Sequence, residues 1–171
     1  NQLHLSSYPA YSMPASVTSN VREIARYQLV AVGKDGFGIP VETTYVQIPG
    51  LLDDLYAGAA TQVDLGVSWA GTIPTLRLWA PTAYPDTGVT LNLYSAPDTL
   101  ADQVAMTLDD DSGVWSVTGD ASWDRMYYDF TLEVYTYAES RVVTNTVTDP
   151  NSVSLSANSV RSQIVNLDDL D

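Results

Sequence analysis

Apolar and polar residues alternate in short segments along the second half of the chain, and Gly, Pro, Asp and Ser separate these segments. In the segment 127–137 the apolar set is Tyr128, Phe130, Leu132 and Val134, and the polar set is Asp129, Thr131 and Glu133. Successive side chains of a strand point to opposite faces, so we expect the apolar set to face a core and the polar set to face solvent. The same alternation places Leu91 and Leu93 inward, and Asn92 and Tyr94 outward.

From residue 73 onward the pattern predicts strands at regular spacing. They cover residues 75–80, 89–94, 103–108, 114–118, 127–137, 141–147 and 163–167. Short strands separated by turn residues are typical of two-layer β proteins. The fold class that we predict is therefore all-β, with an immunoglobulin-like antiparallel β-sandwich over about residues 72–171.

The first 70 residues have a less regular pattern, which predicts a partial β-rich domain with one short helix. The expected elements are a leading segment at 1–17, a helix at 21–26 behind N-capping Thr18, Ser19 and Asn20, strands at 28–32 and 41–48, a single helical turn at 51–56, and a connector at 57–72 that carries one strand at 62–69. We therefore divide the chain into residues 1–70, the β-rich domain with its connector, and residues 71–171, the sandwich.

The charge balance restricts the partners of the chain. Asp and Glu number 21 against 7 Lys and Arg, which gives a formal net charge of −14. Such a surface repels nucleic acid and anionic membranes, because phosphate binding needs Lys and Arg. No apolar run approaches the ~20 residues of a membrane-spanning helix. We therefore expect neither nucleic acid nor a membrane as a partner, whereas a neutral polysaccharide suits the charge.

The length and the cysteine count exclude further classes. The chain has 171 residues, whereas a (β/α)8 barrel needs about 250. Because the chain has no cysteine, disulfides and thiolate metal sites are excluded. This absence fits an exported protein, and no signal peptide is visible because Asn1 leads directly into Gln-Leu-His. We expect a secreted or cell-surface bacterial protein.

Several sequence motifs, which we call phrases below, carry a family resemblance. In the sandwich region they are Pro74 to Ala83, Ser112 to Gly119, Trp123 with Arg125 to Tyr128, Val134 with Tyr135, Val147 to Pro150, and Ser154 to Ser159. Upstream they are Gln28 to Val32 and Val46 to Tyr56, with His4, Leu5 and Tyr8. Together they resemble the end of the N2 domain and the family 48 carbohydrate-binding module of type I pullulanases and limit dextrinases. These are α-1,6-cleaving debranching enzymes of glycoside hydrolase family 13. One departure is Asn151, where that family usually carries an aromatic residue.

The resemblance implies a non-catalytic accessory region that docks on and supports a catalytic barrel. The implied parent is a retaining hydrolase of α-1,6 linkages in pullulan, amylopectin and limit dextrins, with its aspartate nucleophile and glutamate acid on the barrel. No segment here matches the barrel motifs, so we assign no catalytic residue. A docking role predicts a broad apolar surface rich in Tyr and Trp.

Two alternatives stay open. The first is a freestanding module that binds α-glucan, such as starch, pullulan or limit dextrin, and it predicts coplanar exposed rings in a shallow groove. The second is an unrelated adhesion-type β-sandwich, which periodicity alone allows.

Sugar binding would use aromatic rings outside the core, because ring faces stack on the apolar faces of glucose. The candidates are Trp123, Trp79, Tyr94, Tyr135 and Tyr137. Trp123 lies in a predicted loop and is the freest of these platforms, whereas the alternative for Trp79 is packing against the barrel or the preceding domain. Trp115 shares a face with Val117, so we assign it to the core.

The acidic runs offer one candidate metal site. Asp109, Asp110 and Asp111 are candidate calcium ligands, although the EF-hand spacing and its closing Glu are absent. We interpret Asp53–Asp54 and Asp168–Asp169 as solvated runs. The sole histidine, His4, is interpreted as an ordinary residue of the leading segment. No cofactor is expected for this chain, and calcium is considered only for the parent enzyme.

Overall fold

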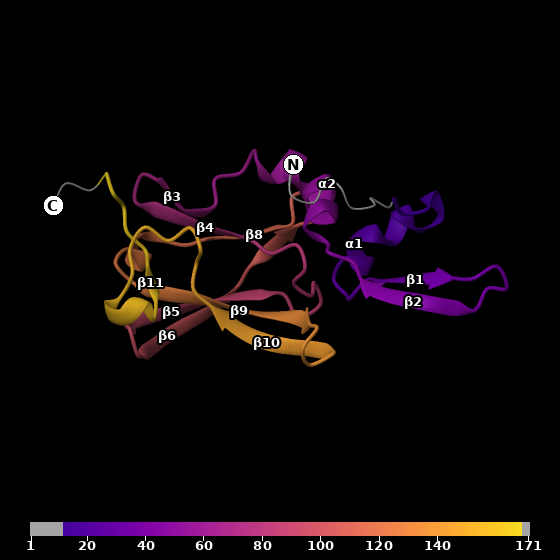
Figure 1. The fold of residues 1–171 in the computed structure, drawn as a ribbon. Coiled ribbons are helices and arrows are strands. Elements are labelled where there is room, and N and C mark those ends of the chain that lie inside the picture. The colour runs from indigo at the N-terminus through magenta and orange to yellow at the C-terminus, as the bar shows by residue number, and fades with distance from the viewer. Residues whose placement is uncertain (1–11, 169–171) are drawn as a thin grey trace.

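Two antiparallel β-sheets face each other across one hydrophobic core in the computed structural model, which describes residues 12–168 (Figure 1). The first sheet has the strand order β10-β9-β5-β6, with β11 paired to β9, and the second has the order β3-β4-β8-β7. The strands of the first sheet are β5 Val89–Ala96, β6 Thr99–Ala105, β9 Tyr127–Thr136, β10 Arg141–Val147 and β11 Ser162–Gln163. Those of the second are β3 Gly66–Ala70, β4 Ile73–Trp79, β7 Thr107–Asp109 and β8 Val114–Thr118. The predicted all-β antiparallel sandwich is confirmed.

The core is built from the inward sets of the alternating strands. Both sheets supply it, with Leu76 and Leu78 on β4, Leu91 on β5, Trp115 on β8 and Phe130 on β9 all buried. Full burial of one such side chain contributes about 1.5–3 kcal/mol, so this core is the main source of stability. The assignment of Trp115 to the core is confirmed.

One predicted strand is two strands in different sheets. The segment 103–108 was expected to be continuous, but β6 ends at Ala105 and β7 begins at Thr107 in the opposite sheet. Met106 lies between them; its side chain is buried and its N–H donates to the Val89 carbonyl at 2.8 Å. Met106 is apolar and continues the alternation of apolar and polar residues, so the sequence pattern does not indicate that the chain passes from one sheet to the other here.

Residues ahead of the sandwich form a hairpin and more helix than the sequence predicts. The elements are the 3₁₀ turn η2 Ala15–Asn20, α1 Val21–Ile24, β1 Val30–Lys34, β2 Pro40–Tyr45 and α2 Pro49–Ala60. The single helical turn expected at 51–56 is wrong, because α2 has 12 residues. Pro49 fits the first helical turn, where no N–H is needed, and alanine in the expected connector continues the helix. The next strand, β3, begins before residue 71 and pairs with β4.

The N-terminal elements contact the sandwich at one end, and the β1–β2 hairpin projects from that end while β11 lies at the other (Figure 1). Arg22 of α1 lies 3.4 Å from the Asp111 carboxylate and stacks over the Tyr56 ring of α2 at 5.4 Å. Tyr56 is itself buried. Within residues 12–168, neither helix has the length and apolar character needed to cross a membrane.

Candidate functional site

Four tyrosine rings meet where the N-terminal segment reaches the sandwich, and we call them the tyrosine cluster. They are Tyr27 after α1, Tyr84 in the loop after β4, Tyr135 on β9 and Tyr137 just beyond it. Ring centroids are 5.9 Å apart for Tyr27–Tyr84 and Tyr27–Tyr135, and 6.0 Å for Tyr135–Tyr137. The structure therefore brings together two sequence candidates, Tyr135 and Tyr137, with two residues that strand periodicity did not single out.

The rings of the tyrosine cluster are partly exposed. Tyr27 and Tyr137 are 41% and 49% exposed. Burial, together with the neighbouring Tyr27, raises the pKa of Tyr84 to about 12. The rings are inclined to one another by 57° to 83°, so they form no coplanar platform. The coplanar rings expected of a freestanding module are absent from this cluster.

Trp79 lies at the end of β4 on the outer face of its sheet. Its indole N–H donates to the Ser112 carbonyl at 2.9 Å, which fixes the ring. Trp79 lines a cleft that α2 and the connector form with Asn151. The alternative that Trp79 packs toward the preceding elements therefore agrees with this position.

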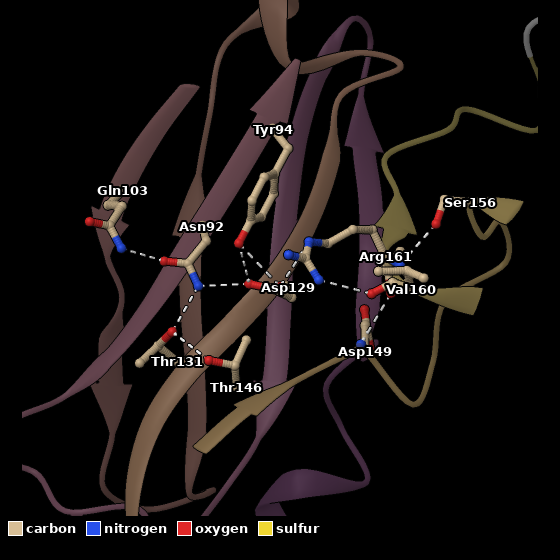
Figure 2. A network of polar contacts seen from close by, with 11 residues as sticks. Asn92, Tyr94, Gln103, Asp129, Thr131, Thr146, Asp149, Ser156, Val160 and Arg161 are labelled. Atoms are coloured by element: carbon tan, nitrogen blue, oxygen red, sulfur yellow. Dashed lines mark hydrogen bonds and ion pairs between the residues drawn. The ribbon is translucent and has the colours of Figure 1, made fainter. Parts of the chain in front are cut away.

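Tyr94 belongs to a polar network on the outer face of β5 and β9 (Figure 2). The Arg161 guanidinium lies 4.3 Å from the centre of the Tyr94 ring, and Arg161 Nε lies 3.1 Å from Asp129 Oδ2. Asn92 donates to Asp129 Oδ1 at 2.7 Å. Burial and then the Asp129 charge raise the pKa of Tyr94. Because Arg161 lies over its ring, Tyr94 does not present an open face.

This network corrects the expected solvent face. Asp129 and Asn92 were placed outward by alternation, yet both are buried. Cross-strand pairing sets Asn92 beside Asp129 and Gln103, and the Gln103 amide donates to Asn92 Oδ1 at 2.7 Å. The segment that carries Arg161 returns over β9 and covers them. At Asn92 and Asp129 the outer face is therefore covered by hydrogen bonds and an ion pair rather than by solvent.

Trp123 is not a free platform. It ends the short turn η3 Ala121–Trp123, is half-buried, and packs against the hydrophobic core. A Cβ built on Gly119 would lie 2.2 Å from the Trp123 ring, so the ring rests on the Gly119 backbone. The expectation of an exposed ring was wrong, because the apolar ring finds room beside a residue without a side chain.

Two carboxylates of the Asp109–Asp111 run have different partners. Asp109 accepts the Ser112 hydroxyl, which is the main reason that the pKa of Asp109 is lowered, and Asp111 pairs with Arg22. Among residues 12–168, no group of three or more His, Cys, Asp or Glu side chains is placed to hold a metal ion. His4 and Asp169 lie outside the described residues.

The buried carboxylates serve structure. Asp149, in the Val147 to Pro150 phrase, accepts the Tyr128 hydroxyl at 2.7 Å and the Asn151 N–H at 2.8 Å. The Asp149 N–H donates to the Ser162 hydroxyl at 3.1 Å. Both Asp149 and Asp129 are therefore engaged within the fold, which leaves neither as a free acid or base.

Large apolar side chains are exposed at both ends of the molecule. On the hairpin they are Val30, Val32, Phe37, Ile39, Val41 and Tyr45. At the end of β10 there is Val147, and in residues 148–168, which we call the C-terminal segment, there are Val153, Leu155, Val160 and Leu167. Cross-strand pairing of Val30 with Tyr45 and of Val32 with Thr43 puts one apolar set on a single hairpin face. The docking role predicted a broad apolar surface rich in Tyr and Trp, whereas these exposed side chains are mainly aliphatic and none of them is Trp.

The comparisons with known proteins agree with these features. Residues 2–54 match the pullulanase N2 domain, and residues 64–152 match carbohydrate-binding module 48, the isoamylase N-terminal domain. A pullulanase of Klebsiella pneumoniae is 39% identical over 97% of this chain and 15% of its own length. Pullulanase 1, chloroplastic, of Arabidopsis thaliana is 30% identical over 96% of this chain and 16% of its own.

Solved structures give the same result. Klebsiella pneumoniae pullulanase complexed with maltotriose has a TM-score of 0.85 and 39% identity, and the match covers 98% of this chain and 15% of that one. The pullulanase from Bacillus acidopullulyticus has a TM-score of 0.58 and 25% identity over 73% of this chain and 14% of that one. The chain thus spans about a sixth of the length of these relatives.

Proposed function

The chain belongs to the carbohydrate-binding module 48 family, and from this membership we propose that it is the non-catalytic accessory region of a pullulanase-type debranching enzyme. The parent would hydrolyse α-1,6 linkages in pullulan, amylopectin and limit dextrins with a retaining family 13 barrel. The chain would dock on that barrel and support it. We also propose an exported bacterial parent.

The exposed apolar surface carries the docking proposal. The C-terminal segment leaves Val153, Leu155 and Val160 from 48% to 61% exposed, although the fold has a well-filled core. Exposed apolar side chains that gather in one segment are typical of contact surfaces. The buried contacts of Asp149 and Arg161 hold this segment against β9, so its apolar side chains are presented in a fixed place.

The test combines activity and association. The purified chain should release no reducing sugar from pullulan, and release would overturn the assignment. Mixed with the separately produced barrel of its parent, the chain should co-elute in gel filtration. Leu155→Asp should weaken this association, whereas Leu100→Asp, which changes an equally exposed leucine on edge strand β6, should not. Equal elution of the two variants would contradict docking through the C-terminal segment.

A second function, contact with α-glucan, is favoured by the exposure of Tyr27 and Tyr137 in the tyrosine cluster. Inclined rings with hydroxyl groups at their edges suit a curved, neutral sugar chain, and the family description names carbohydrate binding. Affinity electrophoresis in amylopectin or pullulan gels tests this contact. We expect Tyr137→Ala to migrate faster than the unsubstituted chain. Phe37→Ala, which removes an exposed ring at the hairpin tip, is the matched control.

A further inference from the structure

A cleft of about 500 Å³ lies between α2 and the sandwich. None of the residues that line it belongs to the tyrosine cluster. Its apolar lining includes the half-buried Trp79, Ala57 and Ala60. Its polar lining includes Asp53, Asp64 and Asn151, all exposed. An apolar wall with a few polar groups around it is the usual composition of a small-ligand site.

The aromatic wall is held in place before any ligand arrives. Trp79 donates its indole N–H to the carbonyl of the buried Ser112, so the ring orientation is fixed. A side chain that is already ordered loses little entropy when it binds, which favours affinity.

The opposite walls leave room beside this ring. Ala57 and Ala60 present only methyl groups from α2. Asn151 is pinned through its backbone, because its N–H donates to Asp149 at 2.8 Å and because Gly66, with φ +81°, packs closely against it. An aromatic residue at position 151 would be large enough to fill part of the cleft.

The polar groups of the cleft are available. No hydrogen bond within residues 12–168 engages the side chains of Asp53, Asp64 or Asn151. Two carboxylates accept hydrogen bonds and repel anions, and the amide both donates and accepts. A neutral ring with hydroxyl groups at its edge and an apolar face matches this set.

We infer that this cleft binds a glucosyl unit of an α-glucan, with Trp79 against the sugar face and Asp64 and Asn151 toward its hydroxyl groups. It is a second contact beyond the tyrosine cluster, and it rests on the proposed glucan-binding function for the class of sugar.

The test uses the purified chain, maltotriose and the NMR signals of the four indole N–H groups. Trp→Phe substitutions assign these signals. Maltotriose should shift the Trp79 signal in a saturable way and leave that of buried Trp115 unchanged. Asn151→Tyr should abolish the Trp79 shift by filling the cleft. Asp64→Asn, an exposed and isosteric change, should weaken maltotriose binding roughly fivefold, because it replaces a hydrogen bond to a charged oxygen by one to a neutral oxygen, a difference of about 1 kcal/mol.

The outcomes separate this inference from the proposed glucan-binding function. Tyr137→Ala should leave the Trp79 shift intact, and Asn151→Tyr should still be retarded in the pullulan gel. If maltotriose does not shift the Trp79 signal but retardation in the gel still depends on Tyr137, the cleft proposal is wrong and glucan binding by the tyrosine cluster is supported. A Trp79 shift that survives Asn151→Tyr, or a maltotriose affinity that Asp64→Asn leaves unchanged, also overturns the cleft. If neither shift nor retardation occurs, both glucan contacts fall.

Discussion

Replacing Arg161 with methionine tests the buried polar network most directly. The change keeps an apolar stem of similar length but leaves the Asp129 carboxylate, 1% exposed, without its cation. Removing one partner of a buried ion pair costs about 3–5 kcal/mol. The Arg161 side chain is 23% exposed, and Asp129 keeps the Asn92 amide at 2.7 Å, so the lower part of the range applies. We expect a loss of about 3–4 kcal/mol.

The assay is urea unfolding followed by tryptophan fluorescence. All four tryptophans lie between residues 69 and 123, within the sandwich, so the signal reports this domain. For a chain of this size a loss of 3 kcal/mol lowers the melting temperature by about 6–12 °C. The double variant Asp129→Asn/Arg161→Met should be more stable than Arg161→Met alone, because no unpaired charge stays buried.

A matched control is the exposed pair Arg141–Glu139, whose side chains are 69% and 49% exposed. Surface pairs contribute about 0–1 kcal/mol, so Arg141→Met should change stability by no more than that. If Arg161→Met costs less than 1 kcal/mol, or no more than Arg141→Met, the network does not hold the C-terminal segment as argued.

Two further predictions concern single sites. Gly119→Ala should destabilise the sandwich by about 1–3 kcal/mol, since the new methyl group would overlap the Trp123 ring; Gly36→Ala, with open space at its Cβ, should be near neutral in the same urea titration. The pKa of Tyr84 is 10.0 in the unfolded chain and about 12 in the folded one. The stability that Tyr84 contributes is therefore complete below pH 10 and is lost as the pH rises toward 12. Tyr84→Phe should reduce the loss of stability in this pH range. Urea midpoints and absorbance at 295 nm would check this, and identical pH profiles would count against it.

Alternation located most of the strands, but the strand predicted at 163–167 is wrong beyond its first residue, because β11 is only Ser162–Gln163. The predicted bounds 114–118 and 141–147 are those of β8 and β10. The change of sheet at Met106 could not be predicted, because it depends on the opposite sheet offering an edge. The length of α2 was missed for a local reason. Its last residues are Ala-Gly-Ala-Ala, in which alanine favours a helix and glycine disfavours one, so composition alone did not separate a helix from a connector.

The candidate site could be predicted only in part. Tyr135 was found because it lies on a strand with clear periodicity. Tyr84 and Tyr27 lie in loops, where no period assigns a face, and their contact depends on how the N-terminal elements sit on the sandwich. Trp123 was misplaced because a loop residue was taken to be exposed, while its actual position depends on the bare backbone of Gly119.

The burial of Asp129 depends on the motif Ser154 to Ser159, which the sequence analysis had already singled out. Alternation assigns Asp129 to solvent, and its cover comes from Arg161, far along the chain. The Ser154 to Ser159 phrase explains how that cover arrives: Asn158 and Ser159 have φ of 60° and 56°, a left-handed pair that reverses the chain. The Arg161 N–H then donates to the Ser156 hydroxyl at 2.9 Å, and Ser162 pairs with Tyr128 of β9. This motif is therefore the local cause of a long-range contact.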